Sequence, residues 1–298
     1  MIGKGTELQQ FLADEVNQYK GIAVPVFASP LRCLLTRKLP VSKLHPNPDD
    51  EFCFPDIGPN MGIISDYEKE YRRFGDDMQG ARMAGSGISE PIQVQRIQPG
   101  GYMILNGHHR WIAAMRAGIK KIPVKLVNIT QHADIRDFLS GVHNSRRVAL
   151  DLDEVVFAAP GEPAEKPLRF PLNRLYPQAL RLGIPSLFYY LSAHRYDIWV
   201  YTSRLVSYDE ILRLFRHYHA GLVYVVTGVG SKGPVSREKK KQLEKMIFEK
   251  YPVTYHIDQK SVLKISGADR EFEEFLLPGK TAWSREVQDV FRKQDANG

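Results

Sequence analysis

The chain has few cysteines and no long apolar run, and these two absences exclude several classes of protein. Cys33 and Cys53 are the only cysteines among 298 residues. They are too few for a disulfide-stapled domain and lack the C-x-x-C spacing of a zinc site. No apolar run approaches the roughly 20 residues that span a bilayer, and the N-terminal segment from Met1 to Lys20 is too polar for a signal peptide. We therefore expect a cytoplasmic protein with no membrane partner.

The length of the chain indicates two domains, and its net charge does not decide which kind of molecule it binds. With 298 residues, the chain exceeds a single domain of roughly 100–200 residues, so two domains are expected. The net charge of +7 is spread over both halves. It suits a phosphorylated small molecule or a nucleotide as well as it suits nucleic acid, which is possible but not favoured.

The pattern of apolar residues changes near Asn144–Arg146, where we place the domain boundary. In residues 1–146, strands expected at 91–97, 102–105 and 122–127 accompany helices near 6–18, 65–74 and 108–117, as in an α+β domain. In residues 147–298, continuous apolar strands at 148–152, 198–201, 222–226 and 253–257 alternate with helices. This order predicts a parallel sheet flanked by helices, so the chain as a whole is of the α/β class.

Polar residues stand at the carboxyl ends of three of these strands, the edge where open α/β sheets place their sites. Asp151 and Asp153 follow the first strand, Thr202 ends the second and Asp258 follows the last. One aspartate can attack a phosphoryl group while the other protonates the leaving oxygen and then activates water. Thr202 can hydrogen-bond the phosphoryl group, and Asp258 can bind Mg²⁺. Alternatively, Thr202 and Asp258 cap the helices expected after them, the second starting near Lys260.

Such a site also needs a lysine that offsets charge on the transferring phosphoryl group. On the helix expected from Ser236, stepping back from the buried face reaches Lys240 and Lys239, on the inward side of the first turns. Lys232, in the preceding glycine-containing loop, is the competing candidate.

The order D-x-D, strand-end threonine, helix-borne lysine and strand-end aspartate resembles the haloacid dehalogenase (HAD) superfamily over about residues 147–277. The resemblance implies a HAD-like Rossmannoid sheet, an aspartyl-phosphate intermediate at Asp151 and Asp153 as general acid/base. It also implies Mg²⁺ held by Asp151, Asp258 and the main-chain carbonyl of Asp153. Gln259 stands where the family usually has a second carboxylate. Residues 158–176 are too short for a large cap domain, so we expect a capless, open site.

A second set of chemical groups lies at a strand–turn–helix junction in the first half, Asn106-Gly107-His108-His109-Arg110. Backbone N–H groups at a helix start, with an arginine and two imidazoles, form a site for phosphates. With Pro91-Ile92-x-Val94 before it and Ile122-Pro123-Val124 after it, this stretch resembles the ParB/sulfiredoxin superfamily over about residues 38–130. The resemblance implies a nucleotide-binding domain, with ATP, ADP or CTP as its ligand.

The G-H-H-R turn is similar to that of the free-serine kinase branch, in which a glutamate after the first strand deprotonates the serine hydroxyl. By position, Asp49-Asp50-Glu51 supplies that base, and Glu51 is our choice; the alternative is a solvated carboxylate in an acidic turn. An acidic residue usually precedes the glycine, where this chain has Asn106. Sulfiredoxins need a cysteine where this chain has His108, and partitioning ParB proteins carry a helix-turn-helix region where an α/β domain follows here. Neither of those activities is expected.

Two functions follow from these patterns. The leading hypothesis is a two-domain phosphoryl-transfer enzyme, with a Mg²⁺-dependent HAD-type phosphohydrolase joined to a nucleotide-binding domain that is itself a candidate kinase for serine or another small hydroxyl compound. The alternative is a nucleotide-sensing or nucleic-acid-binding ParB-like module whose HAD domain processes nucleotides or the ends of DNA or RNA. Binding that weakens steeply as salt rises would favour nucleic acid.

Overall fold

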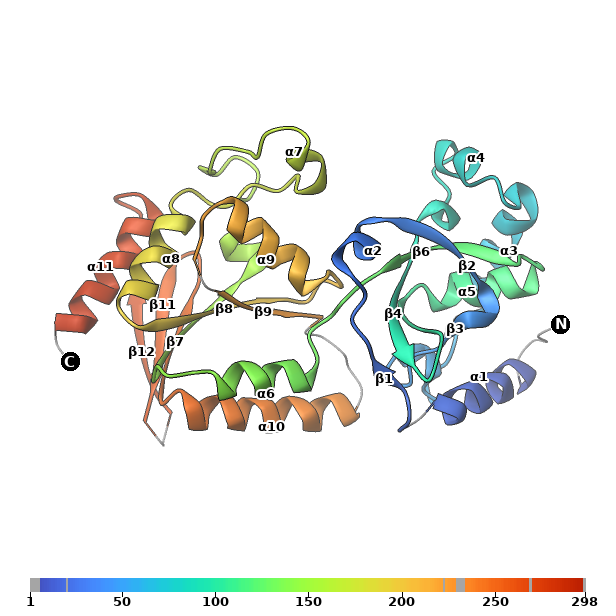
Figure 1. Cartoon of the computed structure of the whole chain (residues 1–298), viewed down its shortest axis with the longest axis horizontal. Helices are drawn as coiled ribbons and strands as arrows, with labels where there is room; N and C mark the ends of the chain where they lie inside the picture. Colours follow the sequence, from blue (N-terminus) through green and yellow to red (C-terminus); the bar gives the residue numbers. More distant parts are fainter. Residues whose placement is uncertain (1–5, 20, 222, 229–233, 268–269, 297–298) are drawn as a thin grey trace. The chain divides into compact units, whose positions relative to one another are not determined.

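The computed structural model describes residues 6–19, 21–221, 223–228, 234–267 and 270–296, and the side chains of residues 234–240 lie outside the described set. The chain forms two compact units (Figure 1). One contains the described residues up to Ile129, and the start of the helix that begins at Pro234 groups with it as far as Glu238. The other contains the rest of the chain from Thr130. None of the described helices is long and apolar enough to cross a membrane.

The first unit is built on a six-stranded sheet in the order β2-β6-β4-β5-β3, with β1 paired to β4. Its strands are β1 (Val24–Pro25), β2 (Thr36–Pro40), β3 (Leu44–His45), β4 (Ile92–Gln98), β5 (Tyr102–Asn106) and β6 (Lys121–Leu126). Its helices are α1 (Thr6–Tyr19), α2 (Pro30–Leu34), α3 (Met61–Phe74), α4 (Met78–Met83) and α5 (His108–Arg116), with 3-10 turns at Val41–Lys43, Glu51–Cys53 and Gly87–Ser89. Because β4 pairs antiparallel with β5 and parallel with β6, the sheet is mixed, as in an α+β domain.

The junction between β5 and α5 is fixed by packing beneath the helix. Ile92, Ile104 and Trp111 are buried in one core that joins β4, β5 and α5. Gly107 connects the strand to the helix with φ +105°, and a Cβ there would meet Ile92 at 2.9 Å. Glycine adopts this left-handed conformation without steric cost. The expected strand–turn–helix junction is therefore present.

The second unit is built on a six-stranded sheet in the order β12-β11-β10-β7-β8-β9. The strands β7 (Arg146–Asp151), β8 (Tyr196–Thr202), β9 (Val223–Thr227) and β10 (Val253–Ile257) are parallel, and β11 (Ser261–Ser266) and β12 (Glu271–Leu276) extend the sheet antiparallel. The helices are α6 (His132–Ser140), α7 (Leu172–Leu175), α8 (Ile184–Ala193), α9 (Tyr208–His217), α10 (Pro234–Lys250) and α11 (Trp283–Ala296). A single π-helical turn, Leu152–Val156, follows β7.

Helices cover both faces of the parallel strands: α6 and α10 lie on one face, and α8, α9 and α11 on the other (Figure 1). On the first face, Ile135 and Ile247 pack with Trp199. On the second, Phe188 and Phe215 belong to the core that contains alternate residues of β7 to β10. Strands buried on both faces read as continuous apolar runs. The parallel sheet flanked by helices that the sequence predicts is present.

Two features of the second unit differ from the sequence-based expectations. The prediction of a helix starting near Lys260 is wrong, because the strand β11 begins at Ser261 and pairs antiparallel with β10. Asp258 therefore caps no helix there. In addition, α6 is a helix that the sequence patterns do not predict, and it groups with the second unit. The two units consequently divide after Ile129, earlier in the chain than the boundary expected near Asn144–Arg146.

Candidate functional site

The carboxyl ends of the parallel strands bring the predicted polar residues of the second unit to one edge of the sheet. Asp151 is the last residue of β7, and Thr202 is the last residue of β8, its parallel neighbour on one side. Asp258 directly follows Ile257, the last residue of β10, the neighbour on the other side. Since adjacent strands lie about 4.8 Å apart, these three side chains share one edge.

The backbone of the turn after β7 holds one carboxylate oxygen of Asp151. Its Oδ1 accepts hydrogen bonds from the backbone N–H of Asp153 (2.7 Å) and of Glu154 (2.8 Å), which caps the π-helical turn. Among the described residues, no group hydrogen-bonds the second carboxylate oxygen of Asp151, Oδ2. The side chain is therefore fixed with one oxygen available for attack on phosphorus.

Both carboxylate oxygens of Asp153 have partners. The Thr202 hydroxyl donates to Oδ2 at 2.6 Å, and the Arg204 guanidinium pairs with Oδ1 at 3.0 Å. The same Arg204 Nη1 donates to Oε1 of Gln178 at 2.9 Å. In this structure Thr202 thus positions Asp153, and its contact with a phosphoryl group stays a prediction.

Sequence reasoning missed Arg204, although a usable signal exists. Arg204 stands two positions after the strand-end residue Thr202, at the edge where an anionic substrate would bind. Gln178 carries no such signal, because its approach to Arg204 depends on how the segment between β7 and α8 folds back.

The residues predicted to bind Mg²⁺ offer hard oxygen donors at this edge. Asp151 ends β7 and Asp258 directly follows the neighbouring strand β10, and no described group hydrogen-bonds the Oδ2 atom of either side chain. Gln259 donates its side-chain amide to the backbone carbonyl of Glu154 at 2.8 Å. Within the described residues, no group of three or more His, Cys, Asp or Glu is placed to hold a metal ion. Two carboxylates and the carbonyl of Asp153 nevertheless suit Mg²⁺, which keeps several waters when bound.

The candidate lysines of this site lie outside the described set. Lys239 and Lys240 belong to α10, but their side chains are not among those described, and Lys232 precedes the described part of that helix. Arg204 is a described cation that pairs with Asp153. The lysine assignment therefore stays a prediction.

In the first unit, the predicted phosphate-binding junction has the required backbone. Gly107 has φ +105° and ψ 22°, and α5 begins directly after it at His108. Asn106 is the exposed last residue of β5. The first N–H groups of a helix have no intrahelical partner, so this turn offers donors to an anion.

The two histidines of the junction hold a separate loop in place. Nε2 of His108 accepts the backbone N–H of Asn47 at 3.1 Å, and Nε2 of His109 accepts that of Asn60 at 3.1 Å. The Phe52 ring stacks on His108 with centroids 5.2 Å apart and meets His109 edge-on at 4.8 Å. An imidazole that accepts at Nε2 is neutral and carries its proton on Nδ1. Both rings thus anchor residues 47–60 to the helix start.

Burial favours the neutral form of both imidazoles. The His108 side chain is buried, which lowers its pKa to about 4; the Asp50 carboxylate opposes this effect and His109 adds to it. Asp50 Oδ2 lies 3.7 Å from His108 Nδ1. Burial also lowers the pKa of His109. At neutral pH neither ring carries a positive charge, so any contact with phosphate would be made by an Nδ1–H donor.

The remaining predicted residues of the first unit differ in their burial. Arg110 is 7% exposed, and its Nη1 donates to the backbone carbonyl of Glu90 at 2.6 Å. Glu51 is exposed in the 3-10 turn Glu51–Cys53, which Asp50 caps. Asp50 is an acidic side chain that the structure brings to the junction, and sequence reasoning passed over it in favour of Glu51.

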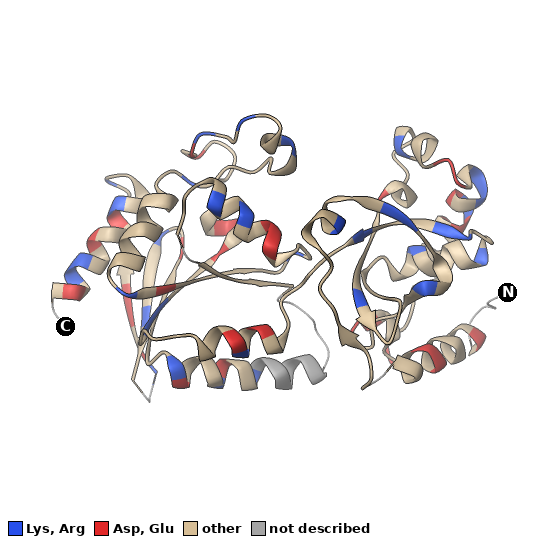
Figure 2. Cartoon of the chain, in the orientation of Figure 1, with Lys and Arg blue, Asp and Glu red and all other residues tan. Residues whose placement is uncertain are grey.

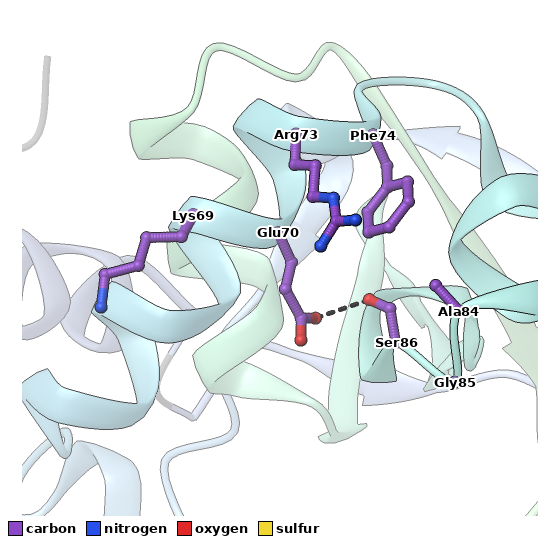
Figure 3. A pocket seen from close by; sticks show the side chains of 7 residues that line it. All are labelled: Lys69, Glu70, Arg73, Phe74, Ala84, Gly85 and Ser86. Atoms are coloured by element: carbon purple, nitrogen blue, oxygen red, sulfur yellow. Dashed lines mark hydrogen bonds between the residues drawn. The ribbon is translucent and has the colours of Figure 1, made fainter.

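A hollow of about 220 Å³ lies between the end of α3 and the segment that follows α4 (Figure 3). Ser86 donates to Glu70 across it at 2.6 Å, and the Arg73 guanidinium lies 4.9 Å from the centre of the Phe74 ring. Lys69, which also lines it, pairs with Asp66 at 2.9 Å. None of the residues that the sequence singles out lines this hollow, and local packing accounts for its polar groups.

The N-terminal part of the chain is similar to ParB proteins. Residues 78–141 match the ParB N-terminal domain family. The probable chromosome-partitioning protein ParB of Vibrio cholerae serotype O1 is 36% identical over 55 residues, which make up 18% of this chain and 19% of that protein. The chain thus spans about a fifth of the length of this relative.

Two solved structures of the C-terminally truncated chromosome-partitioning protein ParB from Caulobacter crescentus also align with the chain. The one complexed with CTP-gamma-S is 24% identical, with a TM-score of 0.25, and the alignment covers 37% of this chain and 56% of that chain. The one complexed to the centromeric parS site is 26% identical, with a TM-score of 0.23 and coverage of 37% and 51%. The family match and the Vibrio sequence match identify the N-terminal part as ParB-like. We call the first unit, up to Ile129, the ParB-like part. The family match ends at residue 141 and does not reach the strand-end site of the second unit.

Proposed function

We propose that the second unit removes phosphate from a phosphomonoester at its strand-end site and that the ParB-like part binds a nucleotide. The observation that carries the proposal is the aspartate pair after β7. Asp151 is fixed by its Oδ1, and Asp153 is held beside it by the Thr202 hydroxyl. Asp258, directly after the neighbouring strand β10, and the HAD resemblance support the same chemistry.

The proposed reaction has two steps. In the first, Oδ2 of Asp151 attacks phosphorus, the bond between phosphorus and the leaving oxygen breaks, and a proton passes from Asp153 to that oxygen. In the second, Asp153 takes a proton from water, the water oxygen attacks phosphorus, and the bond to Asp151 breaks with release of inorganic phosphate. Asp151, Asp258 and the carbonyl of Asp153 would hold a Mg²⁺ ion that neutralises charge on the phosphoryl oxygens.

The junction of the ParB-like part supports binding better than catalysis. Its two histidines use Nε2 to hold the backbone of residues 47–60, and Glu51 is exposed in the acidic turn. The turn at Gly107 offers backbone N–H groups, which is sufficient to bind phosphates. ATP, ADP and CTP are the candidate ligands, and phosphoryl transfer to serine is the weaker hypothesis for this part.

The ParB likeness also favours a second candidate for this part, nucleic-acid binding, because the Vibrio relative is named as a probable chromosome-partitioning protein. Electrophoretic binding at several salt concentrations tests it. An affinity that falls steeply with salt, as released counterions require, would support it. No retardation at low salt would exclude it.

A phosphate-release screen with Asp151→Asn tests the main proposal. Release from p-nitrophenyl phosphate and from nucleoside monophosphates should require Mg²⁺ and should be lost in Asp151→Asn, since an amide nitrogen replaces the attacking oxygen. Its remaining oxygen can still accept the two N–H groups of the turn, so the fold should survive, as circular dichroism would show. Asp289→Asn, on the exposed side of α11, is the matched control and should keep full activity. Wild-type turnover by Asp151→Asn would exclude Asp151 as the nucleophile.

A further inference from the structure

A proline-rich segment leaves the sheet directly after the turn that holds Asp153. It runs over residues 158–182, contains the short helix α7 and projects from the second unit (Figure 1). Bridges between Phe157 and Leu180 and between Ala164 and Arg181 join its two ends. Its five prolines, at positions 160, 163, 167, 171 and 177, restrict backbone freedom. We call it the 158–182 segment, and hydrogen bonds place it beside the turn that holds Asp153.

The 158–182 segment presents positive charge to solvent, and Lys and Arg positions recur along it in Figure 2. Its two glutamates are already engaged: Glu162 pairs with Arg181 at 2.8 Å, and Glu165 accepts the backbone N–H of Gly183 at 2.7 Å. Three further cations are exposed, and no carboxylate among the described residues pairs with them: Lys166, Arg169 and Arg174. The exposed surface of the segment is therefore cationic.

An exposed aromatic ring lies among these cations. The Phe170 side chain is 69% exposed, and the Arg174 guanidinium lies 5.1 Å from the centre of its ring. Leaving a phenylalanine in water forgoes the free energy that its burial would provide. Aromatic rings among cations are the surface on which proteins bind single-stranded nucleic acid: bases stack on the rings, and the cations follow the phosphates.

Hydrogen bonds connect the segment to the proposed catalytic groups. Gln178 accepts from Arg204 at 2.9 Å, and the same nitrogen of Arg204 lies 3.0 Å from Asp153 Oδ1. Arg181 reaches the backbone carbonyl of Glu154 at 3.4 Å. An anionic group that approaches along the segment meets Arg204 next to the aspartates, and pairing with it would release Oδ1 of Asp153 for proton transfer.

We propose that the phosphate removed at Asp151 is the terminal phosphate of a single-stranded nucleic acid. In this complex a base near the end stacks on Phe170, backbone phosphates pair with Lys166, Arg169 and Arg174, and the phosphate next to the terminal one pairs with Arg204. The assignment rests on the proposed phosphatase activity and names its substrate class. A mononucleotide has no phosphate next to the terminal one and leaves Arg204 unpaired, and duplex ends offer no unstacked base to Phe170.

The first test compares substrates that carry the same terminal phosphate. Single-stranded oligonucleotides of DNA and RNA, phosphorylated at the 5′ or the 3′ end, are compared with the matching mononucleotide and with the duplex. At least one strand type should have a kcat/KM about tenfold or more above the mononucleotide and the duplex. The strand with the highest kcat/KM shows whether the site prefers DNA or RNA and whether it acts on a 5′ or a 3′ phosphate. Equal kcat/KM values in all arms would overturn the proposal.

Variants of the 158–182 segment locate the effect. Phe170→Ala should lower kcat/KM for the strand about fivefold or more and leave the mononucleotide unchanged, as loss of one base–aromatic stack predicts. Arg169→Gln/Arg174→Gln should reduce the slope of log affinity against log salt by about 1.4, since each phosphate contact contributes about 0.7 for single strands. Arg216→Gln, which removes one exposed positive charge in the last turn of α9, is the control outside the segment and should change neither value. A loss in the control equal to that in the segment variants would refute a role for the segment.

Binding distinguishes failure of this inference from failure of the proposed reaction. Binding of a labelled single strand is measured by fluorescence anisotropy for two proteins, Asp151→Asn and Asp151→Asn/Phe170→Ala. Neither protein should remove the phosphate, so the strand stays intact during the measurement. Tight binding that Phe170→Ala weakens supports the strand site even if no phosphate release is found, in which case only the proposed reaction fails. Binding that Phe170→Ala and Arg169→Gln/Arg174→Gln leave unchanged would overturn the inference, because any contact would then lie elsewhere on the chain.

Discussion

Acidification should loosen the loop that His108 holds in the ParB-like part. The imidazole is buried and accepts the backbone N–H of Asn47 with its Nε2. Protonation converts that acceptor into a donor and places a charge in a buried position, so the hydrogen bond is lost. We therefore expect residues 47–60, which His108 and His109 anchor, to detach as the pH falls.

The size of the effect follows from the lowered pKa of His108. Burial lowers this pKa from the ordinary value of 6.5 to about 4, so between these two values the unfolded or opened state binds the proton more readily. Stability is therefore fully present above about pH 6.5 and falls as the pH drops toward 4. At about 1.4 kcal/mol per pKa unit, the loss is roughly 2 kcal/mol at pH 5 and roughly 3 kcal/mol at its limit.

A local measurement isolates this contribution, because other titrating groups affect global unfolding. Amide hydrogen exchange at Asn47, corrected for the intrinsic pH dependence, should show protection that declines from pH 6.5 to pH 4.5. His108→Gln, which keeps an acceptor without a titrating proton, should flatten most of this decline and leave the smaller part due to His109, whose pKa burial also lowers. Identical pH profiles for the wild type and His108→Gln would refute the reasoning.

Three further predictions concern the same part of the chain. Arg110→Ala should weaken nucleotide affinity more than tenfold by calorimetry, since a charge-assisted contact contributes about 1.5–3 kcal/mol; unchanged affinity for every ligand would remove it from the site. Glu51→Gln, in the Asp151→Asn background, should leave nucleotide binding intact and lower any transfer of phosphate to serine about a hundredfold or more, which a radiolabel assay measures; unaltered transfer would exclude Glu51 as the base. Gly107→Ala should lower the melting temperature more than Gly118→Ala, because both have positive φ but only position 107 would place a Cβ 2.9 Å from Ile92; equal losses would contradict this packing argument.

The strand-end residues could be predicted from the sequence because the strands that carry them are buried on both faces. Each is a continuous apolar run that ends in a polar residue, as at Asp151 and Thr202. Parallel strands joined by helices end on the same edge of the sheet, so the shared edge of these residues follows without knowledge of contacts. The antiparallel extension was not predicted, because β12 is mostly exposed and its acidic residues give no buried face.

The partners of the site residues could not be predicted, because they come from segments without periodicity. Gln178 meets Arg204 only because the 158–182 segment folds back to the turn after β7. Likewise, the G-H-H-R turn indicates phosphate binding, but the roles of His108 and His109 depend on backbone N–H groups from residues about fifty to sixty positions earlier. The local sequence shows that a donor or acceptor is present, but it does not show which group from a distant part of the chain forms a hydrogen bond with it.

Gln259, which stands where the HAD superfamily usually has a second carboxylate, suits the proposed substrate with several phosphates. A carboxylate there would add negative charge to an edge that already holds Asp151, Asp153 and Asp258, whereas the Gln259 amide is neutral and donates to the carbonyl of Glu154. Near a protein surface, two like charges about 4 Å apart repel by roughly 4 kcal/mol. Arg204 further offsets one of the three aspartates by direct pairing. A neutral Gln259 in place of a carboxylate therefore lowers the repulsion against the proposed substrate with several phosphates, and the exposed cations of the 158–182 segment act in the same direction.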